Sequence, residues 1–232
     1  MQIVKWNPTS QLASDVLEPP KPARLYQPDW YKKYAAFETA KPSFTEGRPN
    51  LTLKHCVPFF DAISAGYILE TWQEIRFDKL LDGSLEYHYP TEPQIIDKRD
   101  HPSIDMGEEY YPIEFIINPP WSPELPNGWS MLYTQPMNRP ELPFFVPSGI
   151  IDCDKFVTSS SKTALPFYLK KSFSGTLPIG TPIVQMIPIK RDSWESSTEN
   201  YEQKKQSQIV FNARKRFWGG YKKFAWDKKS YK

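Results

Sequence analysis

Proline is the residue that most limits the folds open to this chain. There are 24 prolines among 232 residues, about twice the usual share, and only 10 glycines. A proline inside a helix removes a backbone hydrogen bond and clashes with the preceding turn, so long helices are excluded over most of the sequence. The aromatic fraction, 15%, is high and supplies large buried area per residue. We therefore expect a folded, loop-rich protein made of short elements and extended connections.

Residues 114–194 have the pattern of consecutive β-strands. Six short runs rich in β-branched and aromatic residues are separated by Pro, Gly and Asn. The runs are 115–117, 129–133, 144–146, 149–151, 167–169 and 183–187. Two further runs, 74–77 and 85–89, are joined across Asp82-Gly83 and predict a β-hairpin. The sequence therefore predicts a mainly β protein.

The predicted organisation has three parts: an extended Pro-rich arm (1–50), a β-rich core domain (51–194) and a basic aromatic extension (195–232). The arm contains one expected short helix at 28–34, with Asp29 as a cap. The core begins with an alternating segment, 51–57, which predicts a strand.

The C-terminal extension differs in composition from the core: it begins with a polar part and ends with a basic part. Its first part, 195–207, is polar and nearly free of Pro and Gly, which predicts the start of a helix capped by Ser197 or Thr198. Residues 204–232 carry ten basic residues and one acidic residue, a net charge of +9. Residues 1–203 carry 19 basic and 26 acidic residues, a net charge of −7. We therefore expect an acidic body with a partly helical basic end.

Signals of catalysis are scarce. The three histidines have no metal-ligand spacing, so the predicted metal site is none. The alternative is a site assembled in space from His88, His101, Asp97 and Asp105, against which a solvated loop is favoured. No Gly-x-Ser-x-Gly or phosphate-binding Gly-rich loop is present. Cys56 and Cys153 are expected as reduced thiols, and no apolar run is long enough to span a membrane.

Asp152 and Asp154 bracket Cys153. On a strand these two carboxylates would share a face, so one could have its pKa raised by the other and serve acid–base chemistry or bind a cation. The pair could instead be a turn cap or a structural partner of Arg139 or Lys155.

The basic extension is the strongest signal outside the core, because it alternates cations with aromatics. An extension of this kind could bind nucleic acid, or it could dock on the acidic body of the same chain or of a sister subunit. An unattached solvated tail is the third alternative. The predicted partner-binding residues are Arg214, Arg216, Trp218, Tyr221, Lys222, Lys223 and Trp226.

Several motifs in order resemble an uncharacterised family of proteins encoded by tailed bacteriophages, including contractile-tailed phages of marine bacteria. They are WYKK at 30–33, CVPFFDAISAGYI at 56–68, FIINP at 115–119, GWSMLYTQPMNR at 128–139, SGIIDCD at 148–154 and GTPIVQMIPIKR at 180–191. The resemblance spans roughly residues 28–194. It implies a viral protein located in the host cytoplasm or the virion. It implies no site residues, because no activity is established for that family.

A weaker, local resemblance links the strands 149–152 and 180–185 to trimeric dUTPases and dCTP deaminases, which share a β-clip fold. It implies a β-clip-like core and, for a nucleotide-acting enzyme, Asp152 at the base or sugar with Arg139 or Lys190 on phosphate. Mg²⁺ would be expected in that case alone; otherwise no cofactor is predicted. Thr181-Pro182 replaces the usual polar pair before the second strand, and the phosphate motif and Gly-rich lid of those enzymes are missing.

The sequence favours a non-catalytic structural or interaction protein that forms a homo-oligomer through its terminal arms. Other phage proteins are further possible partners, and no membrane partner is predicted. The alternatives are the nucleotide-acting enzyme and a single-stranded nucleic-acid-binding accessory protein.

Overall fold

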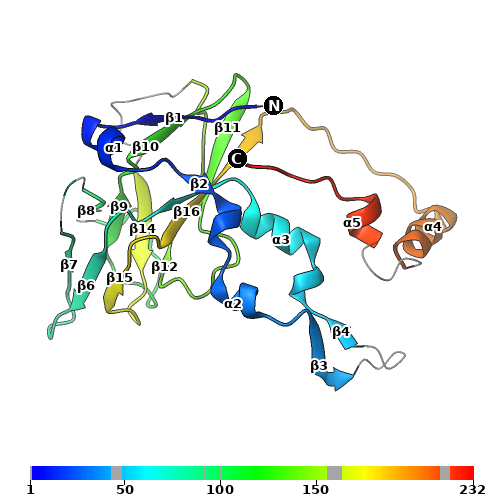
Figure 1. The fold of residues 1–232 in the computed structure, drawn as a ribbon, viewed down its shortest axis with the longest axis horizontal. Helices are drawn as coiled ribbons and strands as arrows, with labels where there is room; N and C mark the ends of the chain where they lie inside the picture. The colour runs from blue at the N-terminus through cyan, green and yellow to red at the C-terminus, as the bar shows by residue number, and fades with distance from the viewer. Residues whose placement is uncertain are drawn as a thin grey trace.

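The computed structural model describes residues 2–42, 49–90, 92, 94–99, 101–155, 164–214 and 220–232. The protein is mainly β, and its described strands form five sheets (Figure 1). Within these residues, no helix is long and apolar enough to cross a membrane.

The largest sheet is antiparallel, with the strand order β13-β11-β16-β5-β2. Its central strand β16 (Pro182–Lys190) pairs on one side with β11 (Trp129–Thr134) and on the other with β5 (Tyr67–Glu70). The first five residues of β16 are all buried, which is the pattern of a strand with both faces inside the protein. The edge strands are β13 (Gly149–Ile151) and β2 (Lys21–Pro22).

Two smaller sheets complete the core. One has the order β12 (Phe144–Phe145), β14 (Leu165–Leu169), β9 (Glu114–Ile117), β8 (Ile96–Arg99). The other has the order β15 (Gly175–Leu177), β6 (Ile75–Lys79), β7 (Leu85–His88), which confirms the predicted hairpin. Buried aromatic rings join these two sheets: Phe77 lies 5.5 Å from Phe115 and 6.4 Å from Phe167, between ring centroids. Strand β8 lies in a polar stretch for which the sequence analysis gave no strand.

The N-terminal arm is packed into the body. Strand β1 (Lys5–Pro8) pairs with β10 (Trp121–Glu124), helix α1 (Gln11–Val16) follows, and β2 adds an edge to the main sheet. A 3₁₀ turn, η1 (Ala23–Tyr26), leads to helix α2 (Asp29–Lys33). The expected cap of this helix was wrong, because its N-cap is Pro28 and the Asp29 carboxylate instead accepts a hydrogen bond from Lys32.

The connection from α2 to the main sheet differs from the prediction. It contains the hairpin strands β3 (Phe37–Pro42) and β4 (Pro49–Leu51), the 3₁₀ turn η2 (Leu53–His55) and helix α3 (Val57–Ser64). The predicted strand at 51–57 was therefore wrong. The Thr52 hydroxyl caps η2 by accepting from the Lys54 amide, and Pro58 is tolerated in the first turn of α3 because no helical bond is needed there.

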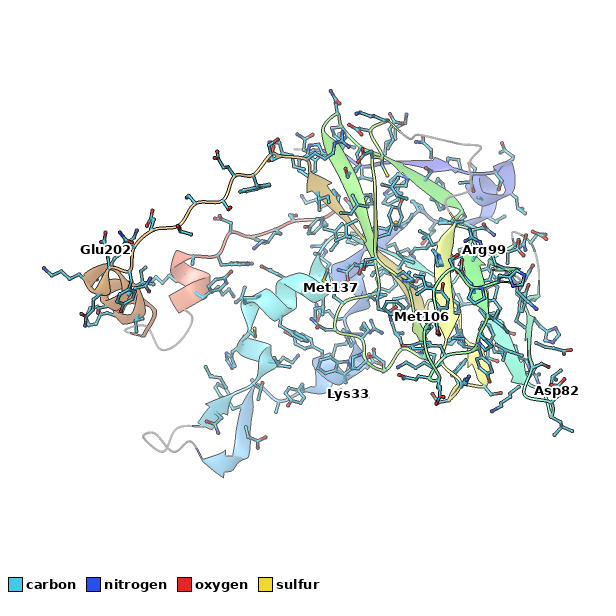
Figure 2. All side chains as sticks on the ribbon, turned by 180° about the vertical axis from the view of Figure 1, so that it is seen from behind. Lys33, Asp82, Arg99, Met106, Met137 and Glu202 are labelled. Atoms are coloured by element: carbon cyan, nitrogen blue, oxygen red, sulfur yellow. The ribbon has the colours of Figure 1, made fainter. Side chains whose placement is uncertain are left out.

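The C-terminal extension is partly helical, as predicted, and leaves the body. Residues 191–202, all of them described, form neither helix nor strand; α4 (Gln203–Arg214) and α5 (Gly220–Phe224) follow. Figure 2 shows Glu202 at one end of the molecule and Asp82 at the other. The predicted caps Ser197 and Thr198 were wrong, because the helix begins at Gln203. Residues 225–232 then return to the body near α3 (Figure 1).

Candidate functional site

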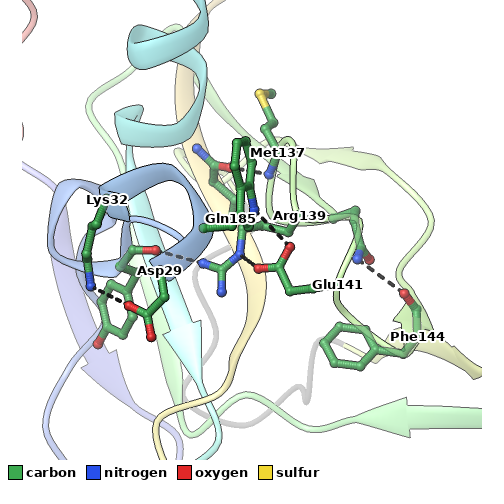
Figure 3. Close-up of polar contacts among 10 residues, drawn as sticks. Asp29, Lys32, Met137, Arg139, Glu141, Phe144 and Gln185 are labelled. Carbon is green, nitrogen blue, oxygen red and sulfur yellow. Dashed lines mark hydrogen bonds and ion pairs between the residues drawn. The ribbon is translucent and has the colours of Figure 1, made fainter. Parts of the chain in front are cut away.

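Helix α3 is fixed on the main sheet by Gln185, a buried polar residue in the apolar strand β16. Its amide nitrogen donates to the carbonyl oxygens of Ala62 (2.8 Å) and Ala65 (2.7 Å). Its amide oxygen accepts from the Met137 backbone N–H at 2.9 Å (Figure 3). One side chain therefore holds the end of α3 and the loop after β11 together.

Gly66 brings the chain after α3 directly against β16. Its φ is +69°, and a Cβ at this position would lie 2.0 Å from the Met186 carbonyl oxygen. The positive φ disfavours any residue with a side chain, and the close approach of the Met186 carbonyl leaves no room for a Cβ atom. Contacts with the main sheet thus fix the end of α3.

A cavity of about 600 Å³, here called the α3 groove, lies between α3 and the returning C-terminal segment. Its lining includes Phe60, Asp61 and Ser64 of α3 and Met137 and Ile187 of the body. Trp226 and residues 228–232 line it from the C-terminal segment. The Ser64 hydroxyl is buried without a hydrogen-bond partner among the described atoms.

The C-terminal segment is held in the α3 groove mainly through Asp61. One carboxylate oxygen of Asp61 accepts from the Trp226 indole N–H (2.8 Å) and from the Lys229 ammonium (2.8 Å). The hydrogen bond to Asp61 raises the pKa of Lys229 and keeps it charged. Tyr231 packs edge-on against Tyr67, with ring centroids 6.1 Å apart.

The predicted partner-binding residues fall into three places. Trp226 contacts the body, and the Lys222 ammonium lies 5.9 Å from the centroid of its ring. Tyr221, Lys222 and Lys223 are exposed on α5, and Arg214 ends α4. Arg216 and Trp218 lie outside the described residues.

Arg139 joins the loop after β11 to the N-terminal arm. Its guanidinium forms an ion pair with Glu141 and donates to the Tyr26 carbonyl oxygen at 2.7 Å (Figure 3). Glu141 in turn accepts from the Trp30 indole N–H at 3.2 Å. In this structure Arg139 therefore binds protein groups on two sides.

Asp152 and Asp154 both belong to a cluster around Arg191. Arg191 donates to Asp154 (2.9 Å), which also accepts from the Gly128 amide (2.8 Å). It lies 3.1 Å from the Asp152 carboxylate, which accepts from the Ser130 hydroxyl at 2.7 Å. The sequence interpretation named Arg139 or Lys155 as the structural partner; the partner is Arg191.

Both carboxyl pKa values move downward in this cluster. The hydrogen bond from Arg191 lowers the pKa of Asp154 to about 2, and the hydrogen bond from Ser130 lowers that of Asp152. The suggestion that one of the pair has a raised pKa is therefore corrected, because the cation and the hydroxyl outweigh the repulsion between the carboxylates. Both groups are ionised at neutral pH.

The three residues named for nucleotide chemistry are divided between the two ends of strand β11. Asp152 bonds Ser130 near the start of β11, and Lys190 pairs with Trp129 at the same end. Arg139 follows the other end of the strand, which closes at Thr134. Six strand residues span about 17 Å. Lys190 itself pairs with Asp192 at 2.8 Å.

Glu114 is a fully buried carboxylate, and it too is bound by several protein groups. It accepts from Arg99 (2.7 Å), from the Ser103 amide (2.6 Å) and from the Tyr168 hydroxyl (2.6 Å). Across the part of the chain that the structure describes, no group of three or more His, Cys, Asp or Glu residues is placed to hold a metal ion.

Sequence reasoning missed Asp61, Gln185 and Tyr231. A signal existed for the first two: each is a lone polar residue in an apolar segment, Phe59–Ile63 and Ile183–Ile187 respectively. Such a residue needs a partner when it is buried.

Comparisons with known proteins give little further identification. No protein-family model and no curated protein matches the chain. Among solved structures, it has a distant likeness to a dUTPase of Staphylococcus bacteriophage 80alpha, a point mutant with dUpNHpp. The identity is 9% and the TM-score 0.35, over 87% of this chain and 90% of that one. Values this low establish neither a shared family nor a shared function.

Proposed function

We propose that this chain is a phage-encoded structural or interaction protein without catalytic function, which assembles with copies of itself through its C-terminal extension. The observation that carries the proposal is the path of the extension: it leaves the main sheet at Lys190, forms α4 and α5 apart from the sheets, and returns (Figure 1).

Apolar surface on the extension supports this function. Ile209 and Val210 of α4 are 54% and 43% exposed, and Trp194 and Tyr201 on the connecting segment are 90% and 76% exposed. Large apolar residues exposed on a projecting segment fit a protein–protein contact. The opposite net charges of the body and the extension favour association between them.

The polar clusters of the body support the absence of catalysis. Arg139, Asp154 and Glu114 each bind several protein groups, which is the arrangement of residues that hold a fold together.

The test is the molar mass in solution, measured by light scattering after size exclusion. We expect the full chain to be oligomeric and a chain lacking residues 195–232, which keeps Arg191, to be monomeric. Replacing Ile209 and Val210 by Glu should weaken assembly, whereas Leu81→Glu, at an exposed apolar position in the β6–β7 turn, should not. A monomeric full-length protein, or a truncated protein of unchanged oligomeric state, would contradict the proposal.

A second measurement addresses catalysis directly. Deoxynucleotides with Mg²⁺ should leave the melting temperature of the full chain unchanged. A ligand at about 100 times its dissociation constant would stabilise the protein by about 2.7 kcal/mol. Stabilisation that disappears in Asp152→Asn would favour a nucleotide-acting enzyme instead.

A further inference from the structure

We infer that the α3 groove is the receptor for residues 226–232 of a second copy of this chain, so that neighbouring copies exchange their C-terminal segments. This inference rests on the proposed function, and it assigns the surface and the residues through which assembly occurs.

The receptor side of the groove is formed by the body alone. Gln185 bonds the last turn of α3, and Gly66 sets the chain after it against Met186. None of these contacts involves the C-terminal segment. When residues 226–232 of a copy have left its own body, the α3 groove of that body therefore keeps its shape. The segment of another copy can then bind there without any rearrangement of α3.

The groove binds a combination of groups, an indole, an ammonium and a tyrosine ring, that among the described residues of the extension occurs only in 226–232. Asp61 accepts an indole N–H and an ammonium on one oxygen, and Tyr67 offers its ring to Tyr231 and its hydroxyl to the Lys232 carbonyl oxygen (3.3 Å). These contacts depend on the local sequence 226–232 and not on which body carries it. They would be the same between two copies, which is the condition for exchange of an element.

The extension is long enough to reach a neighbour. Residues 191–202 are twelve residues without helix or strand, and a chain of that length spans up to about 40 Å. When the segment docks on its own body, α4 projects with Ile209 and Val210 exposed. When it docks on another copy, α4 and α5 are carried toward that copy, where these side chains gain a protein surface.

Complementation between two defective variants tests the exchange. Asp61→Lys destroys the receptor but leaves the segment intact, and the double variant Trp226→Ala/Lys229→Glu destroys the segment but leaves the receptor intact. We expect each alone to assemble about tenfold or more weakly than the native chain, as for loss of a central contact. Mixed at equal amounts, they should form a hetero-oligomer that native mass spectrometry detects.

The controls separate the possible failures. Circular dichroism shows that each variant is folded, and Glu108→Lys, the same charge reversal at an exposed site near β9, should assemble normally. If the native chain is oligomeric but the mixture stays dissociated, the segment docks on its own body and the inference is wrong. If both variants assemble like the native chain, another surface carries assembly and the inference is also wrong. A monomeric native chain would instead overturn the proposed function.

Discussion

Gly66 shows at the scale of one residue how closely α3 lies on the main sheet. We expect Gly66→Ala to lower the free energy of unfolding by at least about 3 kcal/mol, because left-handed strain adds to an overlap with the Met186 carbonyl. Gly83→Ala is the matched control: its φ is +83°, but a Cβ there meets no atom within 4 Å. The control should lose about 1 kcal/mol. Urea unfolding measures both, and equal losses would show that α3 can shift.

Asp154 predicts a particular response to acid. Its folded pKa, about 2, lies below the ordinary value of 3.8, so the ionised carboxylate stabilises the fold above about pH 4. That stabilisation is lost as the pH falls from about 4 to about 2. Asp154→Asn should therefore lower the melting temperature at neutral pH and flatten its decline over this acidic range.

The control for this acid response is Asp192→Asn, at an exposed carboxylate paired with Lys190. Its melting temperature should follow that of the native chain at every pH, because exposed ion pairs contribute little. An unchanged acid response in Asp154→Asn would mean that the Arg191 cluster does not hold the strands together.

At the scale of the element, the attachment of α3 depends on one side chain of another element. Gln185→Leu keeps a similar volume but leaves the Met137 N–H and the carbonyl oxygens of Ala62 and Ala65, at the end of α3, without their partner. We expect a loss of about 3 kcal/mol in unfolding free energy and faster hydrogen exchange in α3. Gln11→Leu, at an exposed site whose partner is Asp15 within α1, should change stability by less than about 0.5 kcal/mol. Protection of α3 that survives Gln185→Leu would contradict this account.

Elements were predictable where their pattern was local. The apolar runs of 114–194 became strands because β-branched and aromatic residues alternate with Pro and Gly turns. Strand β8 escaped prediction, since beyond the buried Ile96 it consists of the polar residues Asp97, Lys98 and Arg99 on an edge. Residues 51–57 alternate like a strand. However, Thr52 caps the 3₁₀ turn η2, and Pro58 lies in the first turn of α3, so two short helical elements form there instead.

At the scale of the whole molecule, the charge division between body and extension was visible in the sequence, whereas the docking position was not. Asp61 and Trp226 are 165 residues apart, and no periodicity or spacing connects them. Sequence spacing likewise does not connect Arg191, which follows β16, with its partners Asp152 and Asp154, which follow β13. Contacts of this kind become visible when the sheet order is known.

The sequence position of the α3 groove has a consequence for synthesis. The body residues that form it end at Ile187, whereas residues 226–232 leave the ribosome later than all of them. Because the earlier part of a chain can fold while the rest is still being made, each new body would present an open groove before its own segment is complete. Chains translated side by side on one messenger would then meet with open grooves and newly finished segments. The local density of nascent chains, more than the strength of any contact, would decide which copy each segment joins.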